Sequence, residues 1–97
     1  MNTLAIVNLT MLVTDLANTA WSYQEKPSEY GAKELLRRFN ELKMFVGDKK
    51  QKNDIVKHIF YARRIDEEVL IELCESLETE IKISELTGKL TLPAYEW

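Results

Sequence analysis

Glycine and proline, the residues that most readily interrupt a helix, are rare and widely spaced in this chain. The 97 residues include three glycines and two prolines, and none of the five lies between residues 54 and 87. Proteins rich in β-strands or loops need many more such turn residues. The sequence therefore predicts an all-α protein.

Apolar residues recur every three or four positions over residues 3–25, which predicts a first helix with one buried stripe. Pro27 ends this helix because a proline disfavours helical dihedral angles in the residue before it. Ser28 is placed to cap a second helix over residues 28–46, and Gly47 is placed to end it. The predicted stripe of the first helix consists of Ile6, Leu9, Val13, Leu16, Ala20 and Tyr23.

The third stretch, 54–87, is predicted to be one long helix that ends at Gly88. Its second half would overhang a bundle of three helices unless it bends near Ser76 or meets another subunit. The tail, 89–97, is too apolar for an ordinary frayed terminus, so we expect it to dock on the bundle. Together these features predict one domain over residues 1–97, a three-helix antiparallel bundle with a long third helix, assembled as a homodimer.

Charge divides the chain into a basic middle and an acidic end. Residues 33–64 hold ten Lys and Arg against four acids, whereas residues 65–97 hold two Lys against nine acids. Such polarity affects the choice of partner more than the fold. We expect pairs one helical turn apart to neutralise most of the arginines: Glu34 with Arg38, Arg37 with Glu41, Arg63 with Glu67, and Arg64 with Glu68.

The lysines around the polar run 48–52 form a candidate binding site in a basic turn. Backbone phosphates of DNA or RNA are natural ligands for such a turn, whereas a merely solvated turn and a protein partner with an acidic face are the alternatives. For the lysines themselves we favour a solvated turn, because lysines supply solubility more often than recognition. Of the two kinds of partner we favour a protein, because glutamates lie within reach of the arginines that suit phosphate best. The basic turn, 49–57 with its flank, comprises Lys43, Lys49, Lys50, Lys52 and Lys57.

Several apolar residues lie outside the predicted core stripes. Because one three-helix core cannot cover them, we expect them to form a homodimer interface, with a groove for a protein partner or ordinary solvent exposure as the alternatives. The candidate interface residues are Val7, Met11, Leu12, Ile71, Ile83, Tyr95 and Trp97.

No arrangement of residues typical of an active site or a metal centre occurs in the sequence. The one histidine, His58, is expected to contact Asp54 in a helix-surface ion pair or a cap contact, and the one cysteine, Cys74, is expected to be a small core residue. Glu72 and Glu75 are interpreted as part of a solvated stripe rather than as a magnesium site. We therefore expect no catalytic residue, no metal and no cofactor.

The lone cysteine excludes an internal disulfide and favours a cytoplasmic location. The apolar opening lacks a basic start and reaches Asp15 too early to span a bilayer, so we expect a buried helix and no membrane association, with a signal or anchor as the alternative. The predicted function is a non-enzymatic helical binding protein, an adaptor or inhibitor of a macromolecular partner. The alternative is a nucleic-acid-binding regulator that uses the basic turn. In size and acidity the chain is similar to small phage-encoded inhibitors such as anti-sigma and anti-CRISPR proteins.

Overall fold

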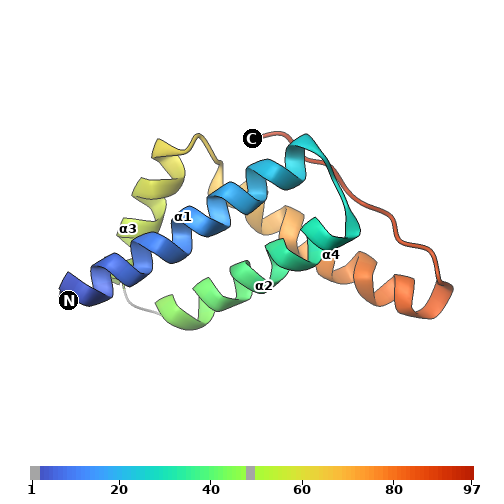
Figure 1. The fold of residues 1–97 in the computed structure, drawn as a ribbon, viewed down its shortest axis with the longest axis horizontal. Coiled ribbons are helices and arrows are strands. Elements are labelled where there is room, and N and C mark those ends of the chain that lie inside the picture. The colour runs from blue at the N-terminus through green and yellow to red at the C-terminus, as the bar shows by residue number, and fades with distance from the viewer. Residues whose placement is uncertain (1–2, 48–49) are drawn as a thin grey trace.

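The computed structural model describes residues 3–47 and 50–97, and these fold into four helices (Figure 1). No strand occurs in these two ranges, so the prediction of an all-α protein is confirmed. The prediction of three helices is wrong, because the long third helix is divided into two. In chain order the helices are α1 (Thr3–Glu25), α2 (Glu29–Val46), α3 (Lys50–Ala62) and α4 (Glu67–Thr87).

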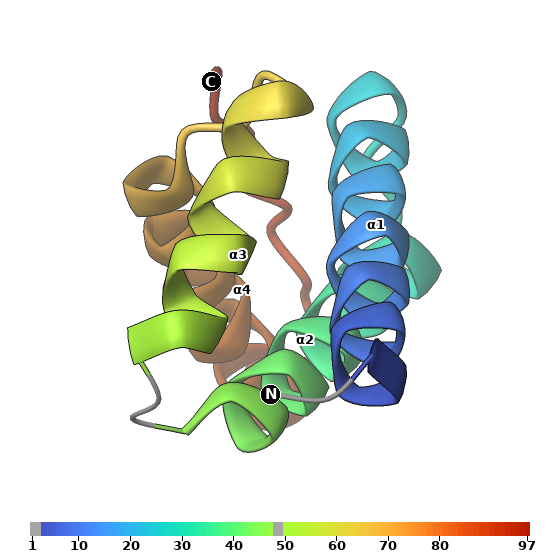
Figure 2. The same cartoon turned by 90° about the vertical axis from the view of Figure 1, so that its left-hand side faces the viewer.

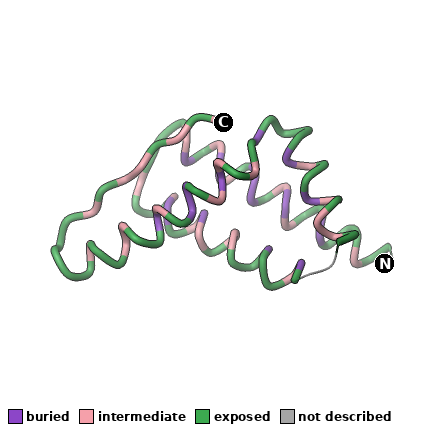
Figure 3. The backbone as a smooth tube through the Cα atoms, turned by 180° about the vertical axis from the view of Figure 1, so that it is seen from behind, coloured by how far each residue is buried: buried purple, intermediate pink, exposed green. Residues whose placement is uncertain are grey.

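Helix α1 is the centre of the bundle, since it packs along α2 and also against α3 (Figures 1 and 2). Helix α4 packs against α2. The buried positions lie on the inward side of each helix, as Figure 3 shows. In the predicted stripe of α1 only Ile6 is not buried, because it lies near the end of α1 that projects from the bundle.

The break between α3 and α4 is made by a Schellman arrangement at the end of α3. The N–H of Ile65 donates to the carbonyl of Phe60 at 2.9 Å. The N–H of Arg64 donates to the carbonyl of Tyr61 at 3.1 Å. Arg64 has a φ of 59°, the left-handed conformation that this arrangement requires and that glycine usually supplies. Ile65 and Phe60 are both buried, as the accompanying apolar contact of the motif requires. The helix therefore ends without a glycine or a proline.

Asp66 then starts α4 as its N-cap. Its carboxylate accepts hydrogen bonds from the backbone N–H groups of Glu68 at 3.0 Å and Val69 at 3.3 Å. The chain thus turns at residues 63–66 and not near Ser76, where a bend is one of the two alternatives that the sequence allows.

The ends of α2 agree with the sequence, whereas the start of α3 does not. The Ser28 hydroxyl accepts a hydrogen bond from the N–H of Gly31 at 3.0 Å, and Gly47 ends α2 with a φ of 56°. Helix α3 begins at Lys50, before the predicted start at residue 54, so most of the supposed basic turn is helical. Lys49 lies outside the described residues.

The C-terminal tail runs back from the far end of α4 along the bundle to the C-terminal end of α1 (Figure 1). The hydroxyl of Tyr23 donates to the carbonyl of Pro93 at 2.6 Å, and the hydroxyls of Ser76 and Tyr95 lie 2.9 Å apart. The expectation that the tail docks is therefore confirmed. At its end, Trp97 meets Trp21 edge to face, with ring centroids 5.9 Å apart.

Candidate binding surfaces

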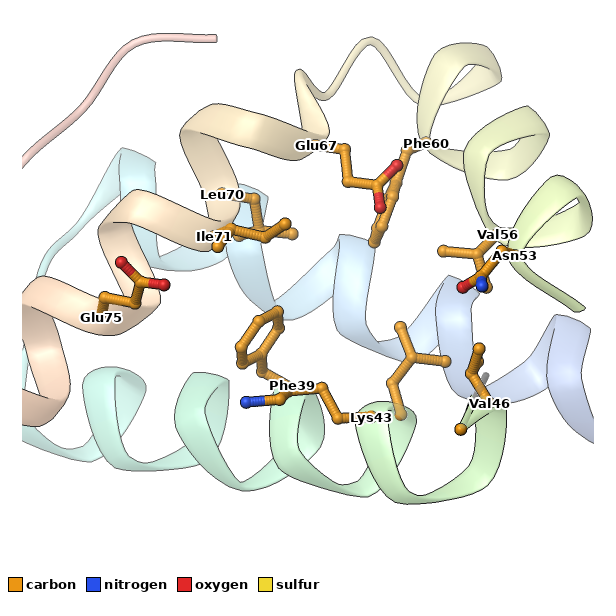
Figure 4. Close-up of a pocket in the computed structure, with 12 residues that line it drawn as sticks. Phe39, Lys43, Val46, Asn53, Val56, Phe60, Glu67, Leu70, Ile71 and Glu75 are labelled. Carbon is orange, nitrogen blue, oxygen red and sulfur yellow. The ribbon is translucent and has the colours of Figure 1, made fainter. Parts of the chain in front are cut away.

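A groove of about 500 Å³ lies between α2, α3 and α4 (Figure 4). It exists because α3 packs on α1 while α4 packs on α2, so the three helices do not close over one another. The groove is mainly apolar, and Phe39 and Ile71 at its sides are only half-buried. Its most buried lining residues are Leu42, Val46, Val56, Phe60 and Leu70.

The two long walls of this groove carry opposite charges. Glu67 and Glu75 belong to the α4 wall, and Lys43 belongs to the α2 wall (Figure 4). The two glutamates are eight residues apart, which corresponds to about 12 Å along a helix. Within the described part of the chain neither glutamate forms an ion pair. The Lys43 Nζ atom lies 5.3 Å from the centroid of the Phe39 ring, on its own side of the groove.

Cys74 is buried in the core, as the sequence predicted. Burial raises the pKa of its thiol to about 12, while the nearby Lys43 lowers this pKa and Glu75 raises it by smaller effects. The thiol is therefore protonated and inert at neutral pH.

A second apolar surface lies on α1 on the side away from the core. Leu4, Val7 and Met11 are 68%, 47% and 60% exposed, and they form one line because they are three and four residues apart. We refer to these three residues as the α1 stripe. Between residues 4 and 14 the helix carries no charged side chain. This part of α1 can therefore be buried against another apolar surface without removing a charged side chain from water.

The structure does not bring the seven predicted interface residues together. Val7 and Met11 belong to the α1 stripe, while Ile71 faces the groove. Leu12 packs against the core, Ile83 is exposed on the far part of α4, and Tyr95 and Trp97 hold the tail in place.

Sequence reasoning missed two residues of these surfaces. Leu4 continues the line of Val7 by one helical turn, and that spacing was visible in the sequence. Glu67 was assigned to a pair with Arg63 inside a continuous helix. It instead lies in the first turn of α4 and lines the groove.

The basic candidates do not form a common patch, because two of them contact aromatic residues of their own domain. Lys52 donates to the backbone carbonyl of Phe45 at 3.0 Å, and its Nζ atom lies 4.4 Å from the centroid of the Phe45 ring. Lys43 lies over Phe39 at the groove. Only Lys50 and Lys57 are exposed on α3 among the described candidates of the basic turn.

Two of the four predicted ion pairs form. Arg37 contacts Glu41 at 2.6 Å and also Glu34 at 2.8 Å, and Arg38 contacts Glu34 at 3.6 Å. The hydrogen bond from Arg37 lowers the pKa of Glu34 below its usual value. Arg38 also reaches Asp15 on α1 at 3.5 Å. The paired arginines are less available to an external phosphate.

The other two predicted pairs, Arg63 with Glu67 and Arg64 with Glu68, are not present among the described contacts. They require a continuous helix, and the turn at residues 63–66 separates their partners. Arg63 instead donates to the side chain of Asn18 at 3.3 Å, and its carbonyl accepts a hydrogen bond from Trp21 Nε1 at 2.9 Å. These contacts attach the end of α3 to α1.

Residues 3–47 and 50–97 contain no group of three or more His, Cys, Asp and Glu placed to hold a metal ion. In the same ranges His58 is exposed and forms no ion pair with Asp54, so the ion-pair form of that prediction is wrong. Helix α1 is long and apolar enough to cross a membrane by length and composition alone, a property that core helices and signal sequences share. No protein family, curated protein or solved structure is detectably similar to this chain.

Proposed function

We propose that this chain is a non-enzymatic binding protein that works as a homodimer and acts as an adaptor or inhibitor of a protein partner. The observation that supports this proposal best is the α1 stripe, a line of exposed apolar side chains directed away from the core. Contiguous exposed apolar surface marks an interaction site more often than it marks ordinary solvent exposure. Small phage-encoded inhibitors such as anti-sigma and anti-CRISPR proteins are similar in type, and inhibition enters the proposal for that reason.

The α1 stripe suits a second copy of the chain because it can pair with itself. When two copies of α1 lie antiparallel about a two-fold axis, Leu4 meets the partner subunit's Met11, and Val7 lies close to the partner subunit's Val7. The uncharged segment 4–14 then meets the same uncharged segment, so like charges do not oppose each other.

Three side chains are too few for a stable interface, which buries about 800 Å² on each partner. The contact can extend onto α2, where Met44 is 86% exposed and lines a shallow hollow together with Leu12. We therefore place the dimer contact on the joint surface of α1 and α2.

The oligomeric state tests this part of the proposal. Light scattering coupled to gel filtration should give about twice the chain mass of 11.3 kDa. Met11→Lys should give a monomer, because the interface would have to bury an unpaired charge. Leu86→Lys is the matched control, since Leu86 is 88% exposed on α4 and outside the stripe. A wild-type monomer at micromolar concentration would remove the dimer from the proposal.

A protein partner is favoured over nucleic acid because the basic residues are dispersed, and several are engaged within the domain. Capture from the native host followed by mass spectrometry should return a protein. Tight binding to mixed-sequence DNA or RNA at physiological salt would replace this proposal if Lys50→Glu, Lys52→Glu and Lys57→Glu together abolished it.

A further inference from the structure

We infer that the groove between α2, α3 and α4 receives one amphipathic helix of the protein partner, with basic residues on the side that faces α4. This inference rests on the proposed function, and it names the partner's recognition element and the place where it binds. It uses a surface separate from the α1 stripe.

The size and lining of the groove fit a helix with three apolar anchors. A cavity of about 150 Å³ accepts one benzene ring, so about 500 Å³ accepts about three side chains of similar size. Helices that bind in grooves present such anchors at positions i, i+4 and i+7. The half-buried side chains of Phe39 and Ile71 would lose their remaining contact with water when those anchors enter.

The charges at the groove determine which amphipathic helix fits. Glu67 and Glu75 lie about 12 Å apart along α4, so a helix running beside α4 meets both with basic residues seven or eight positions apart. Lys43 on the opposite wall repels a basic residue on that side and therefore favours one orientation. The outer face of α4 adds Glu68 and Glu72, whose negative charge speeds the approach of a basic partner.

The same charges disfavour other occupants. A nucleotide or a nucleic acid would bring several negative charges next to Glu67 and Glu75, which have no cation paired with them in the described part of the chain, and Lys43 is the one cation that lines the groove there. A purely apolar helix would leave those carboxylates unpaired at the edge of the contact. A helix that combines apolar anchors with Lys or Arg satisfies both parts of the groove.

The test is a selection of random peptides, each long enough for four helical turns, on the immobilised full chain. Selected peptides should share apolar residues at helical spacing with Lys or Arg seven or eight positions apart. A synthetic peptide with that consensus, labelled for fluorescence anisotropy, then serves as the probe. Ile71→Lys should weaken its binding about tenfold or more, whereas Leu86→Lys, outside the groove, should not change it.

Reversal of the acidic wall gives the decisive comparison. The Glu67→Lys, Glu75→Lys double variant should prefer a matched peptide in which Glu replaces the basic residues. Glu75 is exposed and Glu67 is only half-buried, so this variant should keep the wild-type circular dichroism spectrum even if Ile71→Lys loses stability. Selected peptides that lack basic residues, or a preference that does not reverse, would overturn the inference.

The outcome of this test is separable from that of the proposed function. If the native partner binds the charge-reversed chain as tightly as it binds wild type, the groove inference fails while the binding function stands. If no protein partner is captured and the chain is monomeric, the proposed function fails, regardless of the result of the peptide-binding assay.

Discussion

The C-terminal tail is the element whose removal should test the described packing most directly. Deletion of residues 93–97 removes the carbonyl of Pro93 that accepts the hydrogen bond from Tyr23. It also removes Trp97, which packs edge to face against Trp21. Because Tyr23 is buried, its hydroxyl is left without a partner in a place that water reaches poorly. We expect the truncated chain to fold with reduced stability.

The magnitude follows from the contacts that are lost. An unpaired buried hydroxyl costs about 1 to 3 kcal/mol, and an edge-to-face aromatic pair contributes about 0.5 to 1.5 kcal/mol. Burial of apolar area by the tail stabilises the fold, whereas ordering the tail costs conformational entropy, so these two contributions offset each other in part. The free energy of unfolding should therefore fall by about 2 to 4 kcal/mol.

A double-mutant cycle in urea, followed by circular dichroism, separates the hydrogen bond from the rest. In a Tyr23→Phe background there is no hydroxyl to leave unpaired, so the same deletion should cost about 1 to 3 kcal/mol less. Glu96→Gln is the control, because Glu96 is exposed and its substitution should leave the unfolding midpoint unchanged. Equal costs in the two backgrounds would show that the tail does not hold the Tyr23 hydroxyl. An unchanged midpoint after deletion would show that the tail does not dock.

Three further perturbations follow from the same structure. Arg64→Gly should raise the free energy of unfolding by about 0.5 to 1 kcal/mol, since glycine adopts the left-handed conformation without strain. A thermal melt measures this, and a lower melting temperature would contradict that conformation. Cys74 should react with a thiol reagent at neutral pH only as fast as the domain opens, because burial raises its pKa to about 12. Rapid labelling of the folded protein would show an exposed thiol. Burial also raises the pKa of Tyr23, so the stability due to its neutral hydroxyl is present below pH about 10 and is lost as the pH rises through the folded pKa. Urea midpoints should therefore fall more steeply above pH about 10 in wild type than in Tyr23→Phe, and parallel curves would contradict the assignment.

Local sequence signals predicted most of the helices but not the division between α3 and α4. Pro27, Ser28 and Gly47 act where their backbone preferences suggested, because caps and breakers depend on a few neighbouring residues. The break at Arg64 depends instead on tertiary packing. Burial of Ile65 and Phe60 compensates for the unfavourable dihedral angle of an arginine. Asp66, a good N-cap followed by glutamates, was the one local signal of a new helix.

The candidate surfaces were harder to predict because they depend on how the helices are arranged. The surplus apolar residues of α1 were visible from periodicity, and Val7 and Met11 are exposed as a line. The groove arises only because α3 turns away from α4 at the break, so no pattern in the sequence joined Glu67 to Lys43. The lysines formed a group in the sequence, yet in the structure Lys43 and Lys52 contact aromatic rings of their own domain.

The positions of the two proposed surfaces lead to one more prediction, which concerns avidity. The α1 stripe faces away from the core, whereas the groove opens between the other three helices, with α1 behind it (Figure 4). A dimer formed through α1 therefore leaves both grooves free and can bind two peptides at once. On a surface densely coated with the groove peptide, wild type should dissociate at least about tenfold more slowly than monomeric Met11→Lys. The two proteins should bind the same peptide equally in solution, because Met11 is outside the groove. Equal dissociation rates on the dense surface would show that the two grooves of a dimer cannot be occupied together.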